Sequence, residues 1–207
     1  MNLRMSFFLL PLLVLAWAWP AVASENRTSI AVYGGFLTPD DTSDLILGPY
    51  RFADQELIAV SLSRELFSVG ELFNFSFLDP LKLEAEGVFD YHWGNWPKGK
   101  HHQEFVELIG SFNLRWHRFP WNNTVLTTIG IGDGVSYTPV IPTYELHLNN
   151  TSTYTLNYLM VDVTLAHPKF PQLAFLLRWH HRSGIFGLID DVHGGSDFFT
   201  AGLKYSF

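Results

Sequence analysis

The stretch "RWHHRSGIFG" at 178–187 carries the side chains of this sequence that could most directly perform chemistry. A serine hydroxyl becomes a strong nucleophile when a base removes its proton, and histidine serves best as that base when an acid fixes its tautomer. His181 and Ser183 are two residues apart, so on a strand they share one face, whereas His180 points to the other. The spacing predicts a nucleophile and its base on one face of a β-strand.

Three acids follow the serine and could complete this site, namely Asp190, Asp191 and Asp197. An antiparallel hairpin folded about residue 190 places Asp197 near Ser183, with His181 one step deeper. Asp197 alone occupies a strand position with the same outward parity as His181. We therefore expect Asp197 to be the acid, and Asp190 and Asp191 to be solvated loop charges.

The elements that must position these residues are strands, because apolar residues recur at every second position in segment after segment. Segment 81–93 alternates most regularly, and only Val88 breaks its polar side. Segment 105–116 repeats the pattern, with Ile109 as its exception. The full set of predicted strands is 29–37, 54–66, 81–93, 105–116, 126–137, 154–166, 172–183 and 197–207.

Strands of about 9–11 residues with charges opposite an aromatic-ended apolar face are what a transmembrane β-barrel requires. We therefore predict an all-β fold, an eight-stranded antiparallel transmembrane β-barrel of the outer-membrane type. Arginine near the bilayer midplane costs about 2–4 kcal/mol on the lipid face, so Arg178 and Arg182 should line the lumen, and His181 and Ser183 should face outward. A soluble β-sandwich or lipocalin-like barrel, with its apolar face inward, is the alternative that strand parity leaves open.

The first 23 residues combine an early cation at Arg4, a short apolar core and small residues before Ser24. They predict a signal peptide (1–23) cut after Ala23, which leaves 24–207 as one barrel domain. The chain has no cysteine, which excludes a small domain stapled by disulfides. Its net charge of −7 argues against a nucleic-acid partner.

The C-terminus ends on the predicted strand "FFTAGLKYSF". Its last residue, Phe207, resembles the signal by which the barrel assembly machinery of Gram-negative bacteria recognises outer-membrane proteins. We expect the cell outer membrane as the location and its lipids as the surroundings of the barrel. With both termini in the periplasm, the loops after the first, third, fifth and seventh strands face outside.

Segment 178–207 resembles the outer-membrane lipid A 3-O-deacylase (PagL) family, through its His-x-Ser element, glycine-rich loop, acid early in the last strand and terminal aromatic. The rest of the chain is similar only as an eight-stranded barrel with a signal peptide. The resemblance implies a serine esterase on the outside of the barrel that removes an ester-linked acyl chain from the lipid A of lipopolysaccharide without a metal. In this chain His181 matches the base and Ser183 the nucleophile.

Two positions depart from the family pattern. The family usually carries Glu as the third residue, closer to the serine than Asp197 is, and Asn after the serine as the oxyanion donor. Here Gly184 follows the serine, so a backbone N–H at Gly184 or nearby would have to supply stabilisation worth about 2.7–4 kcal/mol.

We expect no cofactor and no metal. His180 and His181 face opposite sides of their strand, and "HHQE" at 101–104 falls in an expected outer loop. Two functions from other classes remain open. His181 and Ser183 could belong to a polar girdle on a non-catalytic small barrel with a structural or adhesive role, or the chain could be a soluble lipid-binding barrel.

Overall fold

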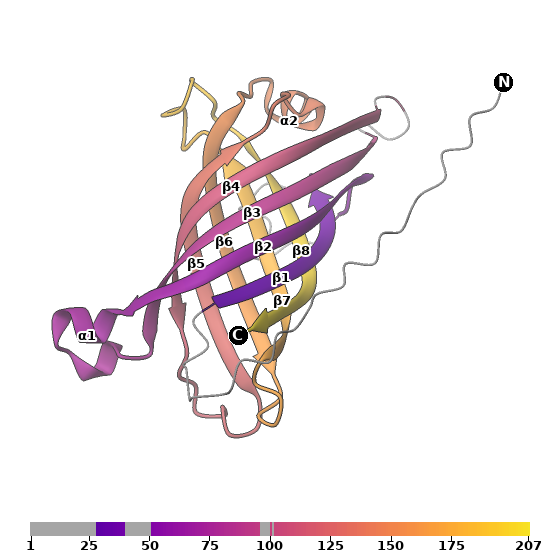
Figure 1. The fold of residues 1–207 in the computed structure, drawn as a ribbon. Coiled ribbons are helices and arrows are strands. Elements are labelled where there is room, and N and C mark those ends of the chain that lie inside the picture. The colour runs from indigo at the N-terminus through magenta and orange to yellow at the C-terminus, as the bar shows by residue number, and fades with distance from the viewer. Residues whose placement is uncertain (1–27, 40–50, 96–99, 101) are drawn as a thin grey trace.

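The computed structural model describes residues 28–39, 51–95, 100 and 102–207. Eight strands close into a barrel in sequence order, each antiparallel to its neighbours, with β8 paired back to β1 (Figure 1). The elements are β1 Thr28–Thr38, β2 Gln55–Ser68, α1 Val69–Phe73, η2 Ser76–Leu78, β3 Leu81–Asn95, β4 His102–Trp116, β5 Leu126–Tyr137, α2 Thr143–Asn149, β6 Thr155–Ala166, β7 Leu173–Ser183 and β8 Gly195–Ser206. The predicted eight-stranded antiparallel barrel is confirmed. The predicted signal peptide, 1–23, lies outside the described residues.

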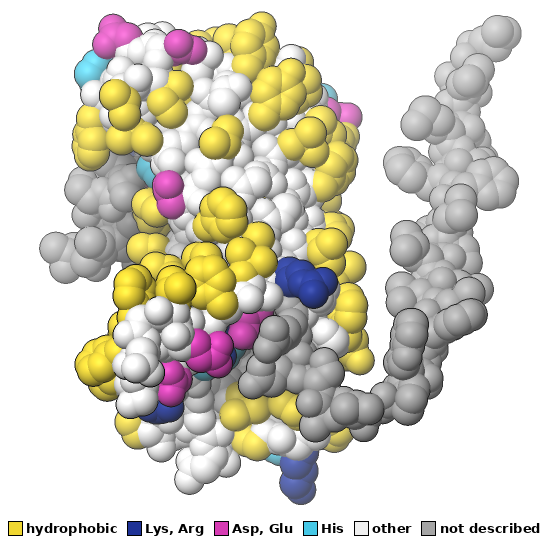
Figure 2. All heavy atoms as spheres, turned by 60° about the vertical axis from the view of Figure 1, so that its left-hand side comes forward, with side chains coloured by type: hydrophobic (Ala, Val, Ile, Leu, Met, Phe, Trp, Pro, Cys, Tyr) yellow, Lys and Arg dark blue, Asp and Glu magenta, His cyan; other side chains and the backbone are white. Residues whose placement is uncertain are grey.

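Alternation along the strands gives the barrel a polar lumen and an apolar exterior. In β7, Arg178, His180 and Arg182 point inward and are buried, as strand parity predicted. Large exposed hydrophobic side chains come from all eight strands, and Figure 2 shows such side chains spread over the barrel wall. Lipid must cover such an exterior, which makes the barrel one of the transmembrane type. The soluble alternative, with its apolar face inward, is wrong.

Ion pairs fill the middle of the lumen. Arg115 donates to Asp162 at 2.6 and 3.0 Å, and Arg178 donates to the same carboxylate at 2.9 Å. The second partners of these guanidinium groups are Glu84 for Arg115 and Glu86 for Arg178, both at 3.0 Å. Removing one partner of a buried pair typically costs about 3–5 kcal/mol, because it leaves an uncompensated charge. This network therefore holds β3, β4, β6 and β7 in one arrangement.

The two apolar residues that interrupt the polar faces of β3 and β4 lie opposite each other. Val88 and Ile109 are cross-strand partners in the β3–β4 ladder, and both are buried inside the barrel. Both belong to a cluster of buried hydrophobic side chains inside the barrel, which also includes Phe105 and Met160. The interruption is a local contact, not an error in the predicted strand parity.

The hairpin of β3 and β4 extends further than the alternation predicted. Asn95 pairs with His102, so 102–104 belongs to β4 and not to an outer loop as expected. Glu104 accepts a hydrogen bond from the Tyr91 hydroxyl at 2.6 Å, and His102 lies 2.9 Å from the same carboxylate. The Tyr91–Glu104 contact crosses the hairpin, the His102–Glu104 contact lies along β4, and both are in the part of the ladder beyond the apolar segment.

A short helical segment projects from the barrel where β2 leads into β3, at the end that carries the C-terminus (Figure 1). Ser68 caps α1 by accepting the Glu71 N–H, and Asn74 ends the helix in the left-handed conformation. The most exposed apolar side chains of α1 and η2 are Leu72, Phe73, Phe75 and Phe77. Such an apolar surface suits the membrane interface beside the barrel wall. None of the described helices is long and apolar enough to cross a membrane.

Candidate active site

The predicted nucleophile and base lie at the end of β7, at the barrel rim that also carries α2 (Figure 1). His181 and Ser183 are on the outer face and are partly buried, which confirms their predicted outward parity. Together with Asp197 of β8 they line one hollow of about 540 Å³. The structure thus brings the three predicted side chains to one place on the outside of the barrel.

The acid lies directly opposite the base. His181 pairs with Asp197 in the β7–β8 ladder, and His181 Nδ1 is 2.8 Å from Asp197 Oδ1. Ser183 pairs with Gly195, so the predicted hairpin register, which set Asp197 opposite the serine, is wrong by two residues. The cause is the connecting loop, where the Gly184 N–H donates to the Gly194 carbonyl and closes the ladder two residues earlier than expected.

Trp179 holds the acid and the base together. Its indole Nε1–H donates to Asp197 Oδ1 at 2.7 Å, so one carboxylate oxygen accepts from both the tryptophan and the histidine side. The indole also stacks on the His181 ring, with centroids 5.2 Å apart and planes 29° apart. Trp179 was not among the predicted site residues, although its outward parity two positions before His181 was a usable signal.

This geometry selects the His181 tautomer that a general base needs. With Nδ1 against the Asp197 carboxylate, the ring donates its proton there, and Nε2 keeps the lone pair that can accept a serine proton. No hydrogen bond joins His181 to Ser183 among the residues that the structure describes. Residues i and i+2 of a strand are about 6.6–6.8 Å apart, and this bond commonly tightens only when substrate is bound.

The other two acids have different partners. Asp190 accepts a hydrogen bond from the Thr153 hydroxyl at 2.8 Å, and Asp191 lies 3.1 Å from His193 Nε2. Both aspartates have positive φ and form the apex of the β7–β8 loop. The described contacts therefore favour Asp197 as the partner of His181.

Gly184, the expected oxyanion donor, uses its backbone N–H for a hydrogen bond within the β7–β8 hairpin. Its N–H is already bonded to the Gly194 carbonyl at 3.2 Å. A Cβ at this position would lie 2.0 Å from the Val192 carbonyl oxygen, so a larger residue does not fit. This close approach accounts for the glycine at this position.

Asn149, the last residue of α2, offers an amide in the same hollow. Its Nδ2 donates to the Gly195 carbonyl at 2.7 Å, and Gly195 is the strand partner of Ser183. An amide nitrogen carries two hydrogens, so the second can bind a ligand atom. A Cβ on Gly194 would lie 2.0 Å from the Asn149 side chain, so only glycine permits this approach. Asn149 was not among the predicted site residues, because α2 was not predicted.

An ion pair inside the lumen fixes α2 over the barrel. Glu145 of α2 binds the Arg182 guanidinium and accepts the Ser196 hydroxyl at 2.9 Å. Burial and the neighbouring Glu145 carboxylate raise the pKa of Tyr144 well above its usual value, so this phenol stays neutral. Arg182 lies between His181 and Ser183 on β7, so the strand that carries Ser183 also anchors the helix that carries Asn149.

An apolar groove on the outer wall begins beside the hollow. It has a volume of about 440 Å³ and runs over β1, β6, β7 and β8. Gly34, Gly35 and Ala201 are among its lining residues, and they leave room there because the glycines have no side chain and Ala201 has only a methyl group. Trp179 lines both this groove and the hollow that contains Ser183, so the two spaces meet at the tryptophan.

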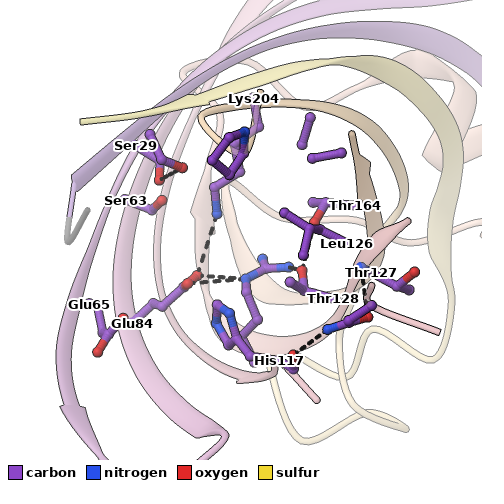
Figure 3. Close-up of a pocket in the computed structure, with 16 residues that line it drawn as sticks. Ser29, Ser63, Glu65, Glu84, His117, Leu126, Thr127, Thr128, Thr164 and Lys204 are labelled. Carbon is purple, nitrogen blue, oxygen red and sulfur yellow. Dashed lines mark hydrogen bonds and ion pairs between the residues drawn. The ribbon is translucent and has the colours of Figure 1, made fainter. Parts of the chain in front are cut away.

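A second pocket, of about 200 Å³, lies at the opposite end of the barrel (Figure 3). Three of its charged side chains pair with one another, since Glu84 lies 3.0 Å from Arg115 and 3.8 Å from Lys204. Burial, together with the Arg115 charge, lowers the pKa of His117 to about 4, so this imidazole is neutral at pH 7. None of the predicted catalytic residues lines this pocket.

No known family model matches the sequence, and no curated protein matches it. Among solved structures, the crystal structure of the outer membrane enzyme PagL aligns with 86% of this chain and with 99% of its own chain. The TM-score of that alignment is 0.48 and the sequence identity is 10%.

Proposed function

We propose that this protein is a serine esterase of the Gram-negative outer membrane that removes an ester-linked acyl chain from lipid A, as the resemblance of 178–207 to the PagL family implies. The observation that carries the proposal is the 2.8 Å contact between His181 and Asp197 on the lipid-facing side of the barrel, beside Ser183. Polar side chains on a lipid-facing wall cost free energy. Their presence there therefore supports a role in a reaction or in ligand binding.

The reaction follows from the order of these groups. Ser183 Oγ attacks the ester carbonyl carbon while His181 Nε2 takes the hydroxyl proton, and Asp197 stabilises the resulting imidazolium. The Asn149 amide is the donor that we assign to the oxyanion of the tetrahedral intermediate. Collapse of that intermediate passes the His181 proton to the sugar alkoxide and leaves an acyl-serine. Water, deprotonated by His181, then releases the fatty acid and restores the serine.

The position of the site supports a membrane lipid as the substrate. The apolar groove beside Trp179 can hold an acyl chain against the barrel wall, while the hollow with Ser183 receives the ester at the rim. Next to the site, the β7–β8 loop exposes Phe186 and Leu188, with exposed fractions of 92% and 79%. These side chains suit contact with the acyl region of the outer leaflet.

The last residue of the chain pairs with the first residue of β1. Phe207 and Thr28 exchange backbone hydrogen bonds of 2.8 and 3.3 Å, so the last residue remains joined to the barrel. We propose that Phe207 is read by the barrel assembly machinery and that a cleaved signal peptide exports the chain.

Mass spectrometry of lipid A from a Gram-negative host tests the proposed function. Cells that express the protein should contain lipid A lighter by one hydroxyacyl group, and cells that express Ser183→Ala should not. Heat-modifiable gel mobility, measured on both proteins in the outer-membrane fraction, is the control for barrel assembly. Unchanged lipid A with well-assembled wild-type protein would favour a non-catalytic barrel.

Replacing Asn149 tests the assigned oxyanion donor. Asn149→Ala should lower kcat by about 10²–10³, the usual effect of removing one such donor, and should change KM little, because the bond strengthens in the transition state. Steady-state hydrolysis of a soluble ester by the purified barrel in detergent measures both constants. Asn123→Ala, at the opposite end of the barrel, is the matched control. If KM instead rose by about 10²–10³ while kcat stayed unchanged, Asn149 would contribute to substrate binding and not to oxyanion stabilisation.

A further inference from the structure

Four titratable side chains that the proposed reaction does not use gather inside the barrel. Asp90 and His92 come from β3, Glu107 from β4 and His180 from β7, and none is more than 1% exposed. Strands β3 and β7 are four places apart in a ring of eight, so they form opposite walls of the barrel. The cluster therefore reaches across the lumen.

The spacing of the donor atoms suits a single metal ion. Asp90, His92 and Glu107 each offer one nitrogen or oxygen within 4.8 Å of the others. His92 Nε2 is 2.9 Å from Glu107, and the two nitrogens of His180 are 3.6 Å from Asp90 and 3.5 Å from Glu107. Around a tetrahedral ion with bonds of about 2.0–2.2 Å, ligand atoms lie about 3.3–3.6 Å apart. Asp90, His92 and Glu107 can therefore serve one centre, and a rotation of the His180 ring would give one of its two nitrogens as the fourth ligand.

Several of these atoms are buried without a donor or acceptor. Neither carboxylate oxygen of Asp90 accepts a hydrogen bond within the described part of the chain, and both His180 nitrogens and His92 Nδ1 also have no such partner there. Asp90 pairs directly with Glu107 across the β3–β4 ladder, so two carboxylates face each other. Like charges in that position are destabilising, and a buried carboxylate that accepts no hydrogen bond is costly. A cation between them would remove both penalties.

The net charge of the buried side chains in the lumen also favours a bound cation. Buried acidic side chains outnumber buried basic ones by two within the barrel, counted over the described residues. The acids are Glu84, Glu86, Asp90, Glu107, Glu145 and Asp162, and the bases are Arg115, Arg178, Arg182 and Lys204. One divalent cation balances this excess, and protonation of both His92 and His180 would also balance it. The two possibilities differ in whether metal is present.

We propose that Asp90, His92, Glu107 and His180 bind one divalent transition-metal ion, with zinc as the best fit. Imidazole nitrogens with carboxylate oxygens are zinc ligands, whereas calcium and magnesium prefer oxygen alone. Ser136 donates to Glu107 and accepts from Arg182 at 2.8 Å, which orients the ligand from a second layer. The ion ties β3 and β4 to β7, the strand that carries His181 and Ser183, and so stiffens the wall behind the active site.

Refolding of the full chain in detergent with Co²⁺ as the only metal tests this site. The unfolded chain exposes the ligands, so the ion can enter as the barrel closes. Wild-type protein should bind one Co²⁺ per chain and show visible d–d absorption, and Zn²⁺ should displace it. Asp90→Asn and His92→Ala should each weaken binding by at least about tenfold.

His102→Ala is the matched control, because His102 lies 2.9 Å from Glu104 just as His92 lies 2.9 Å from Glu107, but on the exposed rim. It should keep full stoichiometry, and metal analysis of the folded fraction, identified by gel mobility, gives the comparison. Folded wild-type protein without Co²⁺, or Asp90→Asn and His92→Ala that bind as tightly as His102→Ala, would overturn the proposal. Histidine NMR signals that show two imidazolium rings at neutral pH in the wild type would assign the charge balance to protons instead.

Discussion

His181→Ala should lower the rate of ester hydrolysis by about 10²–10⁴, the usual contribution of a positioned general base. The reason is that His181 Nε2 is the lone pair left to accept the Ser183 proton once Nδ1 faces Asp197. Single-turnover hydrolysis of a soluble ester by the folded barrel in detergent measures the loss. Because His181 is on the outer wall, the fraction of folded protein should change little.

His167→Ala is the control for that experiment. His167 lies in the turn after β6, at the other end of the barrel, where it packs against Phe170 and accepts the Lys169 N–H. Its removal should leave the hydrolysis rate within about twofold of the wild type, as is usual for changes far from a site. A similar loss in both variants would mean that the rate follows barrel integrity and not base catalysis.

Asp197→Asn should reduce kcat by about 10⁴ while the barrel assembles normally, by analogy with triads in which the acid is made neutral. Asparagine keeps the shape and can still accept the Trp179 N–H, but it can present an N–H to His181 and so favour the wrong tautomer. The negative charge that stabilises the imidazolium is also lost. Rates of ester hydrolysis and gel mobility, measured on the same preparation, separate catalysis from assembly.

The loop acids provide the comparison for that prediction. Asp190 and Asp191 bind Thr153 and His193, so Asp190→Asn and Asp191→Asn should keep near wild-type rates. If either loop variant abolishes ester hydrolysis while Asp197→Asn remains active, the β7–β8 loop must fold back over His181 during the reaction. The pairing of His181 with Asp197 would then not be the catalytic one.

Strand parity in the sequence was enough to predict the barrel and the outward position of His181 and Ser183. The cost of arginine against lipid is large, so Arg178 and Arg182 determine which face of β7 points inward. The alternation in 81–93 and 105–116 worked for the same reason, since each strand separates lipid from a charged lumen. The interruptions at Val88 and Ile109 did no harm because they contact each other.

The register of the last hairpin could not be predicted from parity, because a shift of two residues leaves every side chain on the same face. It depends on the β7–β8 loop, where Ile185 and Phe186 adopt positive φ and the Ile189 N–H bonds to the Gly184 carbonyl. Isoleucine seldom adopts this conformation, so the residue types gave no warning. The same two-residue shift brought Asp197 opposite His181.

Contacts between segments far apart in the chain also could not be predicted from the sequence. Asn149 reaches the site through a seven-residue helix between β5 and β6, and only the glycine at 194 allows it to approach. The cluster of Asp90, Glu107 and His180 depends on the order in which the strands close, because its members come from both walls. Periodicity describes single strands and carries no information about which strands face each other.

Covalent labelling of Ser183 by a fluorophosphonate tests the central claim most directly, because it reports an activated serine without requiring the natural substrate. The folded wild-type barrel should be labelled on the peptide that contains Ser183, and Ser183→Ala should not be labelled there. His181→Ala and Asp197→Asn should be labelled at least about 10²-fold more slowly, since the serine then lacks its activated base. If Ser183 in the folded wild-type barrel stays unlabelled, or is labelled no faster than in His181→Ala, then His181 and Asp197 do not activate it and the esterase proposal is contradicted.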